Sequence, residues 1–189
     1  MKRLHGRVSV LAAGFIGLLF LGTSASAQLV LREQIVEALT AQPRPLSFGD
    51  RLRTRSMTLG NYVVAGAQVP SIDLYEFHFE FNSAVITPQA EPQLRELGAA
   101  LSDPKLKGAT ISINGHTDGV GGDAFNMRLS ERRAATIKWY LVNNFNLLPA
   151  NLHAVGYGKQ RPKNKEDLFA PENRRVEIVN ETARTQARR

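Results

Sequence analysis

The sequence contains no cysteine, and this absence excludes disulfide bonds, thiolate metal sites and cysteine nucleophiles. It also excludes a lipid anchor attached to an N-terminal cysteine. The motifs of common hydrolases are missing as well, because the chain has neither a His-Glu-x-x-His pair nor a serine-nucleophile motif. Covalent catalysis and zinc-dependent hydrolysis are therefore poorly supported.

Two further chemistries are weighed and disfavoured. Three side chains are candidate metal ligands, and His116 is also a candidate general base, but no third ligand follows at helical spacing; the three are His116, Asp118 and His153. The glycine-rich run at residues 119–122 lacks the Gly-Lys-Ser/Thr that completes a phosphate-binding loop. We expect no enzyme, no cofactor and no metal.

The N-terminus has the pattern of an export signal. Three basic residues precede an apolar run at residues 8–21, namely Lys2, Arg3 and Arg7. Ala25, Ser26 and Ala27 then give the small-x-small pattern of a signal peptidase site, so we expect residues 1–27 to be removed. A retained anchor is the alternative, but the run is shorter than the ~20 residues that span a membrane.

Removal of this segment lowers the formal charge from +7 to +4. That modest charge is weak support for nucleic-acid binding, and the chain has no groove-reading motif and no aromatic RNA platform. We therefore expect no nucleic-acid partner. Such mild basicity suits an anionic surface.

Residues 28–71 form an N-terminal segment or linker. Ile35, Val36 and Leu39 predict a short amphipathic helix over residues 32–39. The alternation of arginine at positions 51, 53 and 55 fits an exposed strand or a solvated basic segment.

Residues 111–134 predict a strand, a loop and a helix. Ile111 and Ile113 alternate with polar neighbours, which is typical of a half-buried strand ending at Gly115. Gly119, Gly121 and Gly122 supply conformational freedom to the loop. A helical stripe follows and continues toward residues 143–144; it comprises Leu129, Ile137, Tyr140, Leu141 and Phe145. We expect Trp139 to fill the core or an interface.

The remaining elements surround this unit. Residues 72–81 predict a strand whose core face is aromatic, formed by Tyr75, Phe77, Phe79 and Phe81. A helix should begin at Thr87-Pro88, or at Glu91 in regular form because of Pro92, and end at Asp103-Pro104. We also expect strands at 152–158 and 174–178, and a helical turn at 165–169.

This order of four strands and two helices predicts an α+β fold in which the helices cover one sheet. We place the domain at residues 72–181 and expect a disordered basic tail at residues 182–189.

One acid and one base can face the same ligand across the central loop. Asp118 follows the strand, Arg133 lies in the helix, and Asn126 lies two turns before Arg133. Such a set suits a zwitterion, because a carboxylate accepts from an ammonium while a guanidinium grips a carboxylate. A structural Asp–Arg ion pair is the alternative.

At these residues the chain resembles the OmpA C-terminal-like peptidoglycan-binding domain family. The resemblance covers about residues 75–180 and rests on several spaced motifs in the family's order. They are Phe81 with Ser83-Ala84, Gly115-His116-Thr117-Asp118, Gly121, Asn126, Leu129-Ser130, Arg133-Ala134, Val155-Gly156-Tyr157-Gly158, Pro162 and Asn173-Arg174-Arg175-Val176-Glu177-Ile178.

The resemblance implies a two-layer sandwich in which a mixed four-stranded sheet carries its helices on one side. It also implies a periplasmic, non-catalytic protein that binds the diaminopimelate group of the peptidoglycan stem peptide. It implies that Asp118 holds the ammonium and Arg133 the carboxylate. It also implies that the pocket is lined by Asn82, Asn126 and Arg174, and that the loop is shaped by His116, Thr117 and Gly115. A strand-end cation on the sheet surface is the other interpretation of Arg174.

The sequence thus predicts a wall anchor of a Gram-negative envelope, exported and associated with the outer membrane. Outer-membrane or envelope-complex proteins are further candidate partners. The alternative function is a periplasmic protein-interaction module that acts through residues 28–71. Oligomeric state leaves no mark in the sequence.

Overall fold

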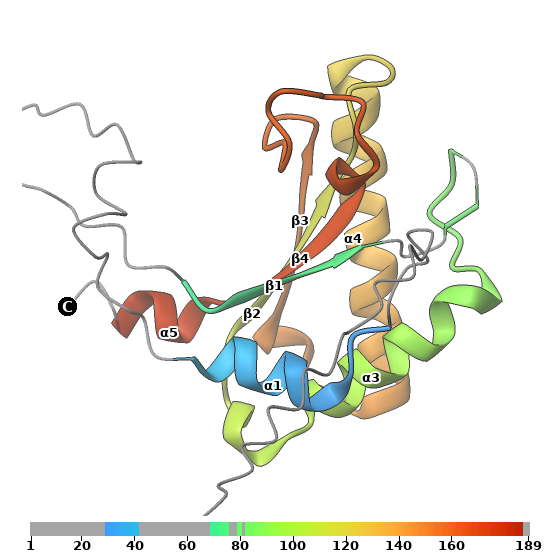
Figure 1. Ribbon diagram of the computed structural model, residues 1–189. Coiled ribbons are helices and arrows are strands. Elements are labelled where there is room, and N and C mark those ends of the chain that lie inside the picture. The colour runs from blue at the N-terminus through green and yellow to red at the C-terminus, as the bar shows by residue number, and fades with distance from the viewer. Residues whose placement is uncertain (1–28, 42–68, 76–78, 81, 187–189) are drawn as a thin grey trace, which may run out of the picture.

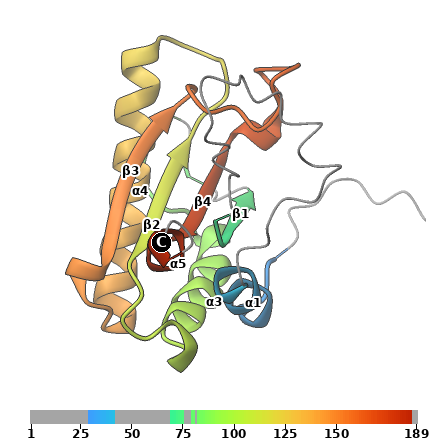
Figure 2. The ribbon, with the colours of Figure 1, turned by 90° about the vertical axis from the view of Figure 1, so that its left-hand side faces the viewer.

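A mixed four-stranded sheet in the order β1-β4-β2-β3 forms the centre of the molecule. The computed structural model describes residues 29–41, 69–75, 79–80 and 82–186. The strands are β1 (Ser71–Tyr75), β2 (Ile111–His116), β3 (Leu152–Gly158) and β4 (Arg175–Asn180). β4 pairs antiparallel with β1 and β2, whereas β2 and β3 are parallel (Figure 2).

The helices are α1 (Arg32–Thr40), α3 (Glu91–Leu101), α4 (Asp123–Phe145) and α5 (Glu181–Gln186). α4 packs along β2 and β3, α3 packs on α4, and α1 packs on α3 and reaches β1 and β4 (Figure 1). The expected α+β fold with a mixed sheet is confirmed.

α1 belongs to the core of the domain. Ile35, Val36 and Leu39 are buried against the residues of α3 and the sheet, so the helix predicted at residues 32–39 is confirmed. The side-chain amide of Asn180, at the end of β4, donates to the backbone oxygen of Leu39 at 3.0 Å. Residues 29–41 therefore pack with the sheet, although they precede the expected boundary at residue 72.

The aromatic core face predicted for the first strand is wrong at Tyr75. β1 ends at Tyr75, which is 41% exposed, whereas Leu74 is fully buried. Leu74 lies opposite Val176 in the antiparallel pair, and this register turns the leucine toward the core. Phe79 packs partly against the core, while Phe77 and Phe81 lie outside the described residues.

β2 is buried on both faces, so the half-buried strand predicted there is wrong, and it ends at His116. Its polar face is paired rather than solvated. Ser112 donates to the side-chain oxygen of Asn114 at 2.7 Å, and Asn114 donates to Glu177 of β4 at 3.0 Å. A central strand can bury such side chains because they satisfy one another.

Of the predictions for the later elements, some are confirmed and others are wrong. The regular start of α3 at Glu91 and the strand at residues 152–158 are confirmed. The helical turn predicted at residues 165–169 is wrong, because this stretch is non-helical and a 3₁₀ turn follows at Pro171–Asn173. The disordered tail predicted at residues 182–189 is wrong for residues 182–186, which belong to α5 (Glu181–Gln186); the backbone N–H of Thr110 donates to the hydroxyl of Thr182 there.

Arginine positions 51, 53 and 55 and the predicted signal peptide lie outside the described residues. Within the part that the structure describes, no helix is long and apolar enough to span a bilayer.

Candidate ligand-binding site

Two glycines let α4 pack very closely on the parallel strands. A Cβ on Gly115 of β2 would lie 2.3 Å from the backbone oxygen of Ser130, and one on Gly156 of β3 would lie 2.5 Å from the backbone nitrogen of Glu131. Only a residue without a side chain fits at such distances. The contact brings the first half of α4, with Arg133, to the carboxyl ends of β2 and β3.

The loop between β2 and α4 is held at the Val120 peptide. The carboxylate of Asp118 accepts from the backbone N–H of Val120 at 3.1 Å, and the side-chain amide of Asn126 donates to the Val120 oxygen at 2.7 Å. Asn126 is only 2% exposed. Its observed role is therefore to fasten the loop beneath the site, and little of it remains for a ligand.

His116 and Thr117 support the same loop from below. Both are buried; the backbone N–H of Thr117 donates to the oxygen of Gly158 at 2.9 Å. The imidazole of His116 stacks on Tyr157, with ring centres 5.4 Å apart. Together with Gly115, they lie at the end of β2, directly before the loop.

A partly buried carboxylate, Glu177, lies beside this stack. Nε2 of His116 lies 3.6 Å from Oε2 of Glu177, a distance that suits an ion pair when the imidazole is protonated. The influence of His116 is the largest of those that lower the pKa of Glu177 to about 2; Asn114 also lowers it, while burial opposes the change.

Asp118 forms an ion pair with Arg174 rather than with Arg133. Oδ2 of Asp118 accepts from NH1 of Arg174 at 3.0 Å, and the side chains are 15% and 51% exposed. Arg174 lies immediately before β4, at the mouth of the loop, and so belongs to the site region. The structural ion pair between Asp118 and Arg133, which was the alternative to a ligand site, is not formed; Arg174 is a cation just before the start of β4 that pairs with Asp118 instead.

Arg133 is partly buried next to this pair. Its Nε donates to the backbone oxygen of Ser83 at 2.9 Å, and its guanidinium lies 4.9 Å from the ring centre of Phe79. Burial lowers the pKa of Arg133, the charge of Asp118 raises it, and the charge of Arg174 lowers it. No carboxylate of the described residues lies within 4.0 Å of the guanidinium nitrogens.

Asn82 lies next to the residue that holds Arg133. It is exposed and adopts a left-handed backbone with a φ of 51°, which asparagine tolerates better than most residues. Asn82 is thus at the edge of the site. The structure brings together Asp118, Arg133, Arg174 and the 82–83 turn; it places Asn126, Thr117, His116 and Gly115 underneath.

The sequence analysis assigned no structural role to Asn173, which organises the loop between β3 and β4. This fully buried residue accepts from the backbone N–H of Asn164 at 2.9 Å and donates to the oxygens of Asp167 and Leu168. The Leu168 oxygen in turn accepts from the N–H of Gly119 at 2.7 Å, which ties the two loops together. The only sequence signal for Asn173 was its position at the start of the family motif at residues 173–178.

The three candidate metal ligands are not assembled. His153 lies near the start of β3, opposite Ser112, whereas His116 lies at the end of β2, opposite Gly158. Among residues 29–41, 69–75, 79–80 and 82–186, no group of three His, Asp or Glu side chains is placed to hold a metal ion.

Comparison with known proteins now identifies the family. Residues 78–175, about half of the chain, match the model of the OmpA family, and the chain belongs to that family. It is 38% identical over 104 residues to a peptidoglycan-associated lipoprotein of Pseudomonas aeruginosa, a match covering 54% of this chain and 60% of the relative. It is 34% identical over 113 residues to outer membrane porin F of Pseudomonas fluorescens, covering 59% and 33%.

Among solved structures, the peptidoglycan-associated lipoprotein of Burkholderia pseudomallei is similar at 26% identity and a TM-score of 0.46, covering 57% of this chain and 87% of that one. The two sequence relatives are each matched over less than two thirds of their length.

Proposed function

We propose that this protein is a non-catalytic anchor that binds peptidoglycan by the diaminopimelate zwitterion of its stem peptide. One observation carries the proposal: Arg133 is a partly buried cation with no carboxylate partner among the described residues. Desolvating a guanidinium without a counter-ion is costly, and a ligand carboxylate would repay that cost.

The chemistry of the site assigns one ligand group to each side. Nε of Arg133 is used by the Ser83 oxygen, which leaves NH1 and NH2 as a parallel pair of donors for a ligand carboxylate. Asp118 offers an acceptor for the ligand ammonium, because a carboxylate has about four lone-pair sites and only two are occupied. Half-exposed Arg174 is free to shift as the ammonium enters.

The names of the relatives support the cellular setting. One is a peptidoglycan-associated lipoprotein and the other an outer membrane porin, and the family match covers the residues of the site. We therefore place the protein in the periplasm, at the outer-membrane side of a Gram-negative envelope. Export through residues 1–27 is part of the same proposal.

Co-sedimentation with insoluble peptidoglycan sacculi tests the function. The wild-type protein should pellet with sacculi at moderate salt, whereas folded Asp118→Ala and Arg133→Ala proteins should remain in the supernatant. If the wild type itself stays in the supernatant, wall binding is rejected and the function moves to residues 28–71 and another partner.

A further inference from the structure

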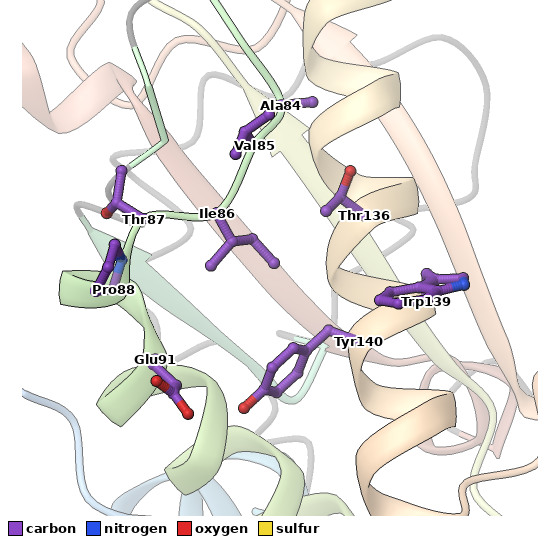
Figure 3. Close-up of a pocket in the computed structure, with 9 residues that line it drawn as sticks. All are labelled: Ala84, Val85, Ile86, Thr87, Pro88, Glu91, Thr136, Trp139 and Tyr140. Atoms are coloured by element: carbon purple, nitrogen blue, oxygen red, sulfur yellow. The ribbon is translucent and has the colours of Figure 1, made fainter.

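An apolar groove adjoins the site along α4. It has a volume of about 650 Å³ and is formed by the 84–88 segment, the start of α3 and one face of α4 (Figure 3). This volume lies within the range of small-molecule sites. The lining consists of Ala84, Val85, Ile86, Thr87, Pro88, Glu91, Thr136, Trp139 and Tyr140. We call it the α4 groove.

Large apolar side chains are left open to solvent there. Trp139 is 67% exposed, although a helical tryptophan was expected in the core or an interface, and Val85 is also exposed. In Figure 3, Ile86 and Tyr140 point into the groove from opposite sides, while Trp139 extends from α4 at its rim. Tryptophan is normally well buried, so this degree of exposure points to a binding surface.

The groove is continuous with the proposed zwitterion site. Ser83, whose oxygen holds Arg133, is followed directly by Ala84 of the groove. Thr136 and Tyr140 follow Arg133 at spacings of three and seven, which places all three on one face of the helix. From Arg133 the groove thus extends about 10 Å along α4, at ~1.5 Å per residue.

Charge limits what the groove can hold. Its one ionisable acid, Glu91, already accepts from NH2 of Arg95 at 2.6 Å, and the other lining groups are aliphatic, aromatic or hydroxyl. A second charged ligand group would lose its hydration without gaining an unused partner. A neutral group with apolar faces, such as a pyranose ring, packs there without that cost.

We propose that the α4 groove binds a neutral N-acetylated sugar of the glycan strand, with Trp139 and Tyr140 contacting its C–H faces. The inference rests on the proposed function, because the zwitterion site fixes the other end of the ligand. Two stem residues separate diaminopimelate from the sugar, and one of them is joined through its side-chain carboxyl, so an extended stem of at least about 10 Å is long enough to reach the far end of the α4 groove.

The test uses Trp139 as an internal reporter, since it is the sole tryptophan of the chain. The purified protein is titrated with a diaminopimelate-containing stem peptide and with the same peptide carrying its disaccharide, by calorimetry and by tryptophan fluorescence. We expect the disaccharide form to bind roughly tenfold more tightly and to be the only one that changes the fluorescence. Trp139→Ala should bring the two affinities together.

A matched control is Leu148→Ala, which removes a side chain of similar exposure, 65%, beyond the end of α4. It should leave the difference between the two ligands unchanged. Equal affinities in the wild type, or an equal fluorescence change with both ligands, overturn the sugar site while leaving the zwitterion site intact. If neither ligand binds, the proposed function fails and the sugar site fails with it.

Discussion

Oδ2 of Asp118 and NH1 of Arg174 lie 3.0 Å apart, and this ion pair leaves neighbouring Arg133 without a carboxylate partner among the described residues. An exposed pair of this kind contributes little to stability, about 0–1 kcal/mol. The pair matters for position, because it keeps one carboxylate beside Arg133, a cation with no carboxylate partner among the residues that the structure describes. A zwitterion completes that arrangement of charges.

Replacement of Arg133 by alanine should cost the diaminopimelate peptide about 2–5 kcal/mol of binding free energy, since the removed contact is partly desolvated. Calorimetry measures the loss. Arg132→Ala is the matched control, because the neighbouring arginine is exposed on α4 and should change the affinity little. An Arg133→Ala protein that binds as well as the wild type would remove Arg133 from the site.

Replacement of Gly115 by alanine should destabilise the fold by about 1–3 kcal/mol or more, because the new Cβ would lie 2.3 Å from the Ser130 oxygen and push α4 away from β2. Gly122→Ala is the control. A Cβ there has no neighbour within 4 Å, so the change should stay below about 1 kcal/mol. Denaturant unfolding compares the two; equal stabilities would show that the close contact is unimportant.

Replacement of Asn173 by alanine should cost about 2–4 kcal/mol of unfolding free energy, since a fully buried amide and its loop partners lose several hydrogen bonds at once. Exposed Asn143, changed to alanine, should cost less than about 1 kcal/mol. Because Asn173 precedes Arg174, ligand binding should weaken too. A variant with wild-type stability would contradict the role of the buried amide.

The low pKa of Glu177 predicts a loss of stability in acid. Its folded pKa is about 2 and its ordinary value 4.5, so its contribution is present above pH ~5 and disappears as the pH falls toward 2. With allowance for partial exposure, the contribution is roughly 2 kcal/mol. Thermal unfolding between pH 2 and 7 measures it. Glu177→Gln should flatten part of this dependence; an unchanged profile would contradict it.

The sequence allowed the fold class to be predicted because the helical stripe of α4 and the alternation of Ile111 and Ile113 in β2 are clear in the sequence. The register of the strands was harder to predict from the sequence. Tyr75 and Leu74 are both apolar and adjacent, and only the pairing of β1 with β4 decides which one is buried. The polar face of β2 was misjudged for a related reason, since its burial depends on partners such as Glu177, which lies 63 residues away.

The site also contains features that the sequence predicted and features that it did not. Asp118 and Arg133 were predicted from their positions at a strand end and on a helix, and the structure places them close enough for their charges to interact. Two long-range contacts could not be predicted, because no periodic pattern in the sequence indicates them. They are the ion pair of Asp118 with Arg174 and the hydrogen bond from Arg133 to the Ser83 oxygen. Asn173 was visible only as the first residue of a family motif, and nothing in the neighbouring sequence distinguishes a buried asparagine that organises a loop from a solvated one.

The central claim is that Arg133 reads the ligand carboxylate, and one comparison tests it most directly. Calorimetry with a diaminopimelate peptide and with its lysine analogue, which lacks that carboxylate, should show at least a roughly thirtyfold preference for the former in the wild type. Arg133→Ala should abolish the preference, and Arg132→Ala should retain it. Equal binding of both peptides by the wild-type protein would contradict the account.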